Sequence, residues 1–436
     1  MMLAVCTLGF FALLLLCLLS SASVSWALAG GLLLFWLYGK RQGYSHRQLA
    51  EMAWRELKKG LIVVVVVFLI GIITGLWRAG GTIAFCIVQG MELVTPNLFL
   101  VVAFLLCAAL SYVLGTSFGV SSTMGVILMA IARSGGVDPV ITAGVILSGV
   151  YFGDRCSPAS SAAVLVATVS ETDLYTNVRN MLRTGLLPTL LTIGIYTALS
   201  FAHPITAVDA SVLTSMRDAF SISWIALLPA LIMFILPLCK VPIRISMLCS
   251  ITVAALIAFF LQGFSVPEIL SITWNGYHPE NKALAQVLGG GGVMSMLSSY
   301  VIVSLASMYS GILRGTGALD ALDRKAAALA ARIGRFPAMV VVTTLCVSVL
   351  CNQAVTVMLG TQLMRSSYTD KDELAQDMEN SGIMIAGLIP WSIACSVPLS
   401  MLGCDARSVP YAALLWLTPI CYAMTKRFFY SGRKTT

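Results

Sequence analysis

The feature that most constrains this chain is a series of apolar runs, each long enough to cross the roughly 30 Å hydrocarbon core of a membrane. Of the 436 residues, 58% are hydrophobic and only 11% are charged, whereas a soluble domain carries about 25% charged residues. The composition therefore predicts an all-α membrane protein whose solvent is the lipid bilayer. Eight uninterrupted runs occur, at about 3–20, 22–39, 61–77, 184–202, 220–238, 245–262, 293–311 and 409–425.

Four further apolar stretches are interrupted by glycine, proline or polar residues. We interpret 98–133 and 338–364 as re-entrant hairpins, and 139–169 and 381–402 as broken helices that cross the membrane. Together with the eight runs, these assignments predict about ten transmembrane helices plus two hairpins.

The basic residues indicate the orientation of the chain. With these assignments and a cytoplasmic N-terminus, 21 of the 27 Lys and Arg residues lie in cytoplasmic segments, five lie in outer segments, and Arg155 lies within the membrane. This bias follows the positive-inside rule. It predicts a multi-pass protein of the plasma (inner) membrane with both termini in the cytoplasm. The net charge of +8 is thus explained by orientation, and no nucleic-acid partner is expected.

The order of elements occurs twice along the chain. Residues 1–202 form one predicted repeat and residues 220–436 the other, with 203–219 as a linker. The first enters the membrane from the cytoplasm and the second from outside, so the repeats are inverted. A shift of about 237 residues places Gly115 on Asn352 and Asp154 on Trp391. Paired interruptions in inverted repeats are typical of a transport site.

Asp154 is the only acidic residue that falls deep within an apolar stretch. An intramembrane charge is costly and is functional by default. We expect Gly153 and Pro158 to break the helix and expose backbone carbonyls. Together with Asp154 and nearby hydroxyls, these carbonyls would form a ligand set for Na+, and the carboxylate could instead exchange a proton. The structural alternative is an Asp154–Arg155 pair that only holds the broken helix together. The hydroxyls belong to Ser157, Ser160 and Ser161.

The hairpin tips supply further candidate ligands. Thr116 and Ser117 lie between two glycines in the first hairpin, although a Gly-x-x-x-Gly pattern also suits helix packing. Amides in an apolar segment need partners, so the second tip is predicted to contact the ion or substrate through Asn352, Gln353 and Thr356. Glu379 begins the second broken helix and is either a gate or proton site or simply solvated. Neither the cysteines nor the histidines have metal-ligand spacing, so no cofactor beyond Na+ or H+ is predicted.

Three segments resemble the NhaC-type Na+/H+ antiporters of the ion-transporter superfamily. They are Gly115-Thr-Ser-Phe-Gly119, Thr142-Ala-Gly144 through Tyr151-Phe-Gly-Asp154 to Ser157-Pro158, and Glu379-Asn-Ser-Gly382 with Ile389-Pro-Trp391. The similarity covers roughly residues 60–200 and 293–425. It implies a secondary active transporter that works by alternating access, most simply by Na+/H+ antiport, and that forms a homodimer.

The chain departs from this family at several carboxylates. Ser161 stands where the family typically has an aspartate, Asn380 replaces another, and Ser392 replaces an asparagine after Pro-Trp. Arg155 then faces fewer acids, which leaves more room for an anionic or zwitterionic substrate. Arg155 and Ser392 are therefore further candidate binding residues. The alternative function is therefore Na+- or H+-coupled transport or exchange of an organic acid or amino acid.

Two other classes of protein, an intramembrane protease and a channel, fit the sequence less well than a transporter does. An intramembrane aspartyl protease needs two apposed carboxylates that share a proton, and the sequence offers no second acid at the depth of Asp154. A channel is compatible with polar broken segments, but the paired interruptions favour alternating access. No enzymatic activity is expected.

Overall fold

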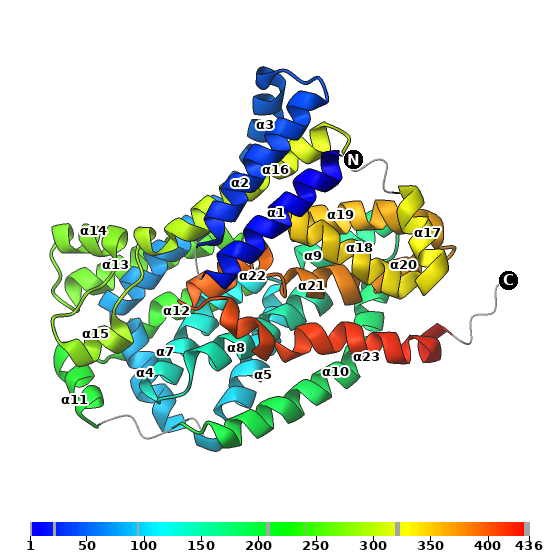
Figure 1. The fold of residues 1–436 in the computed structure, drawn as a ribbon. Coiled ribbons are helices and arrows are strands. Elements are labelled where there is room, and N and C mark those ends of the chain that lie inside the picture. The colour runs from blue at the N-terminus through cyan, green and yellow to red at the C-terminus, as the bar shows by residue number, and fades with distance from the viewer. Residues whose placement is uncertain are drawn as a thin grey trace.

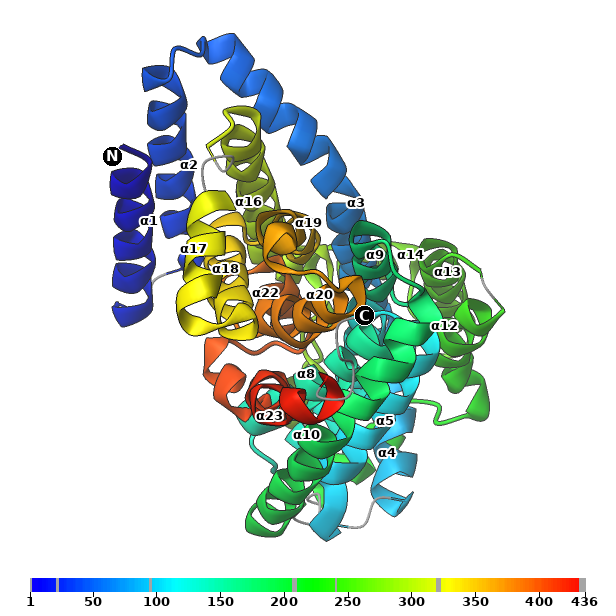
Figure 2. The ribbon, with the colours of Figure 1, turned by 90° about the vertical axis from the view of Figure 1, so that its right-hand side faces the viewer.

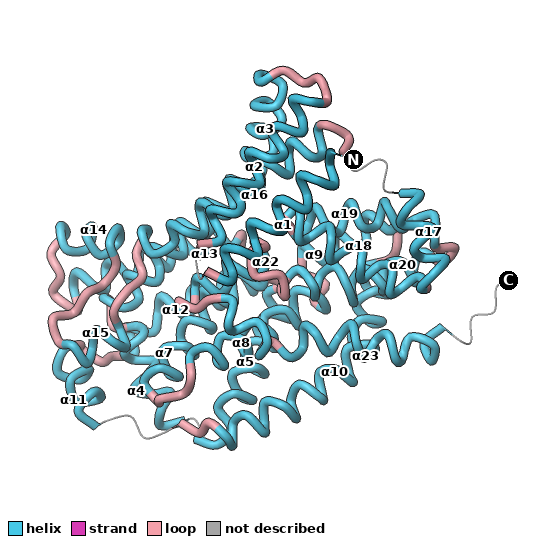
Figure 3. The backbone as a smooth tube through the Cα atoms, in the orientation of Figure 1, coloured by secondary structure: helices cyan, strands magenta, loops and turns pink. Residues whose placement is uncertain are grey.

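In the computed structural model, the described residues are 2–20, 23–93, 96–205, 210–239, 241–318 and 323–430, and they form helices joined by short loops (Figures 1 and 3). Within these ranges, the pairing of extended backbone is limited to one isolated bridge between Tyr277 and Gly290. The chain is all-α, as the sequence predicts. Residues 206–209 of the predicted linker, Met1 and 431–436 lie outside the described residues, and so do the termini whose cytoplasmic location was predicted.

Each of the eight uninterrupted apolar runs is helical. Short 3-10 turns, η3 (Trp224–Leu227) and η4 (Val293–Met296), precede two of these helices. A capping box between Ser45 and Gln48 starts the longest one, because the two residues satisfy each other's backbone amides. The helices are α1 (Met2–Leu19), α2 (Val24–Arg41), α3 (His46–Ala79), α10 (Leu174–Ala202), α12 (Leu228–Leu238), α13 (Ile243–Phe260), α16 (Leu297–Gly315) and α23 (Ala413–Tyr430).

The four interrupted stretches are divided into shorter helices. The first hairpin comprises α5 (Phe99–Leu114), α6 (Ser117–Val120), the π-helix η2 (Ser121–Gly125) and α7 (Val126–Ser134). The first broken helix comprises α8 (Pro139–Cys156) and α9 (Ser161–Ser170). In the second half, the hairpin is α18 (Arg335–Leu350) and α19 (Gln353–Met364). The broken helix there comprises α20 (Lys371–Met378), the π-helix η7 (Glu379–Ile383), α21 (Met384–Ala386) and α22 (Ile393–Met401).

Several helices have no counterpart among the predicted spans and hairpins. They are α4 (Thr82–Leu93), η1 (Pro96–Leu98), α11 (Ala210–Ala219), α14 (Val266–Asn275), α15 (Lys282–Leu288), α17 (Asp323–Ile333), η6 (Arg365–Ser367) and η8 (Ala406–Tyr411). By length and apolar composition, four helical segments of the described chain could each cross a membrane: Ser117–Ser134, Leu174–Ala202, Ile243–Phe260 and Val293–Gly315. The bent pair His46–Leu61 and Val63–Ala79 would be a fifth. These apolar helices suit a membrane protein.

Figures 1 and 2 show the arrangement of the helices. The helices α1, α2 and α16 and the first part of α3 are grouped at one end, and α11 to α15 lie at one side. The helices α5, α8, α10 and α23 pack against one another, with α10 along the lower edge of the molecule in Figure 1. The four interrupted segments therefore meet in the interior, with the continuous helices around them.

Two glycines allow α8 to lie directly on α5. A Cβ at Gly149 would lie 2.5 Å from the Cβ of Cys107. A Cβ at Gly153 would overlap the backbone of Ser111 and Tyr112. Gly153 is helical, since α8 continues to Cys156. The expectation that Gly153 breaks the helix is therefore wrong, and its role is to let two backbones approach.

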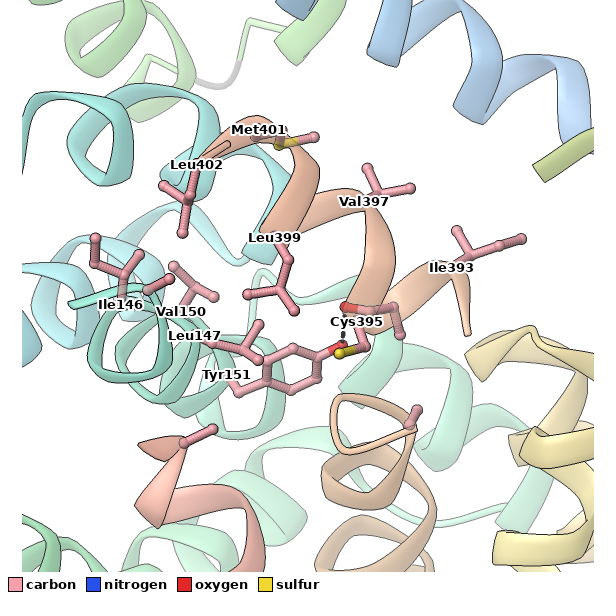
Figure 4. Packing of buried hydrophobic residues seen from close by; sticks show 14 of the residues in the cluster. Ile146, Leu147, Val150, Tyr151, Ile393, Cys395, Val397, Leu399, Met401 and Leu402 are labelled. Atoms are coloured by element: carbon pink, nitrogen blue, oxygen red, sulfur yellow. Dashed lines mark hydrogen bonds between the residues drawn. The ribbon is translucent and has the colours of Figure 1, made fainter. Parts of the chain in front are cut away.

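The two halves share a buried core in which α8 faces α22. Tyr151 is fully buried, and its hydroxyl donates to the carbonyl of Ala394 at 2.8 Å (Figure 4). In the same cluster, apolar side chains of α8 such as Val150 lie opposite side chains of α22 such as Leu399 (Figure 4). Since α8 carries Asp154, this packing positions that residue relative to the second half.

Candidate ion-binding site

The two hairpin tips have the same local geometry. Gly115 ends α5 in the left-handed region at φ 65°, and the Thr116 hydroxyl then accepts from the amide of Gly119 at 3.2 Å. Cys351 ends α18 at φ 54°, and Asn352 Oδ1 accepts from the amide of Val355 at 3.2 Å. The capping residues Thr116 and Asn352 are 236 positions apart, so the tips match at a shift of 236.

The two helix breaks also match each other. The Ser160 hydroxyl donates to the carbonyl of Asp154 at 2.5 Å, and in the second half the Ser392 hydroxyl donates to the carbonyl of Ala386 at 2.5 Å. Each serine also caps the helix that follows. The hydrogen bonds therefore pair Asp154 with Ala386, at a shift of 232, and not with Trp391. No single shift in residue number aligns both the hairpin tips and the helix breaks, because the second half has four fewer residues between its tip and its break.

Each hairpin tip lies against the break of its own half. A Cβ at Gly115 would lie 2.6 Å from the amide nitrogen of Ser160, so only glycine allows this approach. In the second half, the carbonyl of Cys351 accepts from the amide of Ile393 at 2.9 Å. The indole nitrogen of Trp391 donates to the carbonyl of Ser348 at 2.8 Å. Both tips are thereby held where a helix has opened its backbone.

Asp154 lies where these elements meet, with 5% of its surface exposed. Gln353 Nε2, from the tip of the second hairpin, lies 3.2 Å from Asp154 Oδ2. The backbone amide of Ser117, from the first tip, and the hydroxyl of Ser160 are also beside the carboxylate. Three predicted site residues, Ser117, Asp154 and Gln353, are thus brought together from both halves. Their oxygens and neutral donors can hold a small cation or a proton.

Arg155 points away from this carboxylate. Its Nη2 atom donates to Thr184 Oγ1 at 2.9 Å and to Asn380 Oδ1 at 2.7 Å, and the side chain is 2% exposed. Among the described contacts, none joins Asp154 to a cationic side chain. The alternative of an Asp154–Arg155 pair that holds the broken helix is not what the structure shows. Arg155 instead links α8 to α10 and η7.

Glu379 and its neighbour Asp377 are both fully buried. Glu379 Oε2 accepts from Gln376 Nε2 at 2.9 Å. Of the two alternatives that the sequence leaves open for Glu379, the solvated residue is therefore wrong. Asp377 is a carboxylate that sequence reasoning missed. It contacts Lys426 Nζ at 2.5 Å and the hydroxyl of Tyr422 at 2.9 Å. The one signal for it in the sequence is Lys426 at the end of the last apolar run.

The remaining predicted residues shape the backbone around the site. Ser157 accepts from the amide of Ala159 at 3.1 Å, and Thr356 donates to the carbonyl of Asn352 at 2.8 Å. Ser161 is exposed at the first residue of α9, whereas its neighbour Ser160 is fully buried beside Asp154. Thr116, Asn352, Ser157 and Ser392 therefore hold the tips and breaks in place.

An exposed ion network joins the two halves at the C-terminal end of α9, the opposite end from Ser160. Glu171 ends α9 and contacts Arg365 at 2.8 Å and Lys371 at 2.6 Å. Hydrogen bonds from Lys371 and Arg365 hold the pKa of Glu171 below its usual value. Because the carboxylate is exposed, this network contributes little stability.

Comparison with known proteins identifies the family. A model of the Na+/H+ antiporter family matches residues 1–170 and 149–431. The chain belongs to this family. Its relatives include the Na(+)/H(+) antiporter NhaC of Alkalihalophilus pseudofirmus, which is 28% identical over 86% of this chain and 83% of the relative. The resemblance to NhaC-type antiporters is thereby confirmed.

Two other relatives of this Na+/H+ antiporter family member have names that mention organic solutes. The malate-2H(+)/Na(+)-lactate antiporter of Bacillus subtilis is 28% identical over 94% of this chain and 88% of the relative. The arginine/ornithine antiporter ArcD of Halobacterium salinarum is 26% identical over 87% of this chain and 81% of the relative. All three relatives are antiporters, so the chain is placed among transporters of the membrane.

Proposed function

We propose that this protein is a secondary active transporter that exchanges Na+ for H+ by alternating access, with Asp154 as the residue that binds either cation. The observation that carries the proposal is the position of Asp154, a buried carboxylate contacted by both halves. Membership of the Na+/H+ antiporter family supports the same function.

The chemistry follows from the surroundings of Asp154. Its described neighbours are neutral donors, namely Gln353, Ser117 and Ser160. A bare carboxylate in a water-poor interior is costly unless a cation or a proton neutralises it. Na+ and H+ would therefore compete for one group. If the site changes sides only when neutralised, one ion must leave in exchange for the other.

Alternating access is supported by the matched geometry of the halves. In this proposal, about ten transmembrane helices and two hairpins form two inverted repeats in the plasma membrane, with both termini cytoplasmic. Rocking one half against the other would alter the contact between Gln353 and Asp154 and the bond between Tyr151 and Ala394. The homodimer implied by the resemblance remains a prediction.

The decisive experiment compares Asp154→Asn with wild type in proteoliposomes that contain a pH-sensitive dye. An imposed Na+ gradient should change the internal pH with wild type and should not do so with the variant, because the amide keeps the shape and loses the charge. Asp138→Asn is the matched control. Asp138 caps the other end of α8 by accepting from the Val140 amide at 2.7 Å, a role that asparagine can fill. Full exchange by Asp154→Asn would refute the assignment.

A second candidate is exchange of an organic acid or amino acid. A cavity of about 580 Å³ reaches Pro390 at the second break and is lined by Ser396, Ser400 and the ion pair of Arg407 with Asp405. Its volume lies in the range of small-molecule sites, about 300–1,000 Å³. A counterflow assay with a panel of carboxylates and amino acids would test it. Solute exchange without any pH change under a Na+ gradient would favour this function over Na+/H+ antiport.

A further inference from the structure

Two arginines in the last turns of α3 and α7, Arg78 and Arg133, form no ion pair with an acidic residue in the described part of the chain. Their hydrogen bonds go to backbone carbonyls. Arg78 Nη1 donates to Thr74 at 2.8 Å, and Arg133 Nη2 donates to Leu402 at 2.8 Å. Arg78 Nε is buried and has no hydrogen-bond partner. Buried donors are nearly always satisfied by protein, water or an ion, so a further species is expected beside this guanidinium.

The two side chains meet at one place. Arg78 and Arg133 line a single cavity together with apolar residues of α7, α15 and α22. The cavity measures about 10 Å³, which is room for about one particle of the size of a water molecule. The two guanidinium groups are close enough for Arg133 to act electrostatically on Arg78. Two like charges around one small cavity repel each other unless an anion lies between them.

The matching place in the second half holds a carboxylate. Arg314 lies in the last turn of α16 and corresponds to Arg78 at the shift of 236 residues that also pairs the hairpin tips. Arg314 Nη1 lies 3.0 Å from Glu56 Oε1. The same shift places Glu56 on Gly292. The packing agrees, because a Cβ at Gly75, one turn before Arg78, would meet the Gly292 nitrogen at 3.1 Å. Where one half supplies the counter-charge, the other half therefore has a glycine.

The charges nearby favour a monovalent anion. Two aspartates lie near Cys404, a neighbour of Arg133. Each has another role, since Asp405 pairs with Arg407 at 3.0 Å and Asp138 caps α8. With the two arginines of the cavity and Arg407 positive and both aspartates negative, the region carries a net charge of +1. One monovalent anion would neutralise it.

We propose that Arg78 and Arg133 hold a chloride ion between the last turn of α3 and the ends of α7 and α22. Arginine donors bind anions through charge-assisted hydrogen bonds, and a cavity of this size admits a monatomic ion and little more. The polarizable thioethers of Met129 and Met401 line it and can adjust to the radius of a halide. The ion would tie α3, one of the continuous helices, to two of the interrupted segments. It is independent of cation binding at Asp154.

The test measures equilibrium binding of radiolabelled chloride to the full chain in nanodiscs of zwitterionic lipid. Choline is the cation, so that Na+ exchange plays no part. Wild type should bind one chloride per chain. Arg78→Met removes the guanidinium with its unpaired Nε and should weaken chloride binding at least tenfold, or about 1.4 kcal/mol. Absence of saturable binding to wild type would show that water fills the cavity and would overturn the proposal.

Arg314→Met is the matched control, because it removes the corresponding arginine, whose partner is Glu56. Its chloride affinity should stay at the wild-type value. An equal loss in Arg78→Met and Arg314→Met would show a general effect of lost basic charge and would overturn the site.

A second pair of variants keeps both arginines. Met129→Glu places a carboxylate in the cavity and should abolish chloride binding, whereas Met129→Gln is similar in size and uncharged and should retain it. Chloride binding by Met129→Glu at the wild-type affinity would place the ion elsewhere and would overturn the assignment.

Competition identifies the anion. Bromide should displace the bound chloride, whereas acetate and phosphate at the same concentration should not, because both are larger than the cavity. Displacement by acetate would show an open carboxylate site and would overturn the proposal of a halide. Asp154→Asn should bind chloride like wild type, since no step of this binding involves that carboxylate.

Discussion

Replacement of Gly153 by alanine should force α8 away from α5 and displace Asp154, which is the next residue. The added Cβ would overlap the backbone of Ser111 and Tyr112. Backbone atoms cannot rotate away as a side chain can, so the two helices would have to separate by on the order of 1 Å to reach ordinary contact distances. The bond of 2.5 Å between the Ser111 hydroxyl and the Val150 carbonyl would be stretched at the same time.

The expected cost can be set against an opposing gain. Overpacking an interior costs about 1–3 kcal/mol, and the rigid neighbours of Gly153 place it at the upper end. Alanine is favoured over glycine inside a helix by about 1 kcal/mol. The net loss in the free energy of unfolding is therefore about 2 kcal/mol. The rate of transport should fall by up to about 100-fold, because a shift of 1 Å at a reacting group can have that effect.

Thermal unfolding in detergent and flux in proteoliposomes would measure the two effects. Gly194→Ala is the matched control, since Gly194 also lies within a helix, α10, but a Cβ there would meet nothing within 4 Å. That variant should unfold at the wild-type temperature or slightly above it, with normal transport. The reasoning fails if Gly153→Ala unfolds no earlier than Gly194→Ala and transports normally.

Two further substitutions test contacts at the site and beside it. Gln353→Leu removes a donor that stabilises the bare Asp154 carboxylate, so the cation should leave more slowly and the maximal rate of exchange should fall roughly tenfold. The size follows from the contribution of a hydrogen bond to a charged group, about 1.5–3 kcal/mol; an unchanged rate would contradict the contact with Asp154. Lys426→Met leaves the buried carboxylate of Asp377 without its cation and should destabilise the protein by about 3–5 kcal/mol in thermal unfolding. The double variant with Asp377→Asn should recover most of that loss, and failure to recover would refute the pairing.

Much of the helical architecture follows from hydrophobic length alone. All eight apolar runs are helical, and each of the four interrupted stretches is divided between helices, because glycine and unpaired polar groups can end an apolar helix. Proline is a weaker signal, since Pro188, Pro398 and Pro419 lie inside helices. The helices of 266–288 were not predicted, since short helices of mixed composition have no length signal. The prediction that Gly153 breaks the helix is wrong because a helical glycine in close contact with a neighbouring helix cannot be distinguished from a helix-breaking glycine in a sequence.

The site was predictable in its main residue and less so in its partners. Asp154 follows from its isolation in an apolar stretch, and Gln353 from the cost of an amide there. Burial of Asp377 and Glu379 could not be predicted, because it depends on which faces of α10, α20 and α23 meet. The residue of the second half that corresponds to Asp154 could not be predicted either, since the spacing between hairpin tip and helix break differs between the halves.

The difference between the two halves at their breaks bears on stoichiometry. Asp154 and Ala386 occupy equivalent places, each with its carbonyl bound by the serine that caps the next helix. A carboxylate at both places would give two buried charges and would require two cations for neutrality. With Ala386 in one of them, the junction of tips and breaks holds a single acid. Glu379 lies beside Arg155, which offsets its charge. This balance favours one monovalent cation, either Na+ or H+, in each transport step.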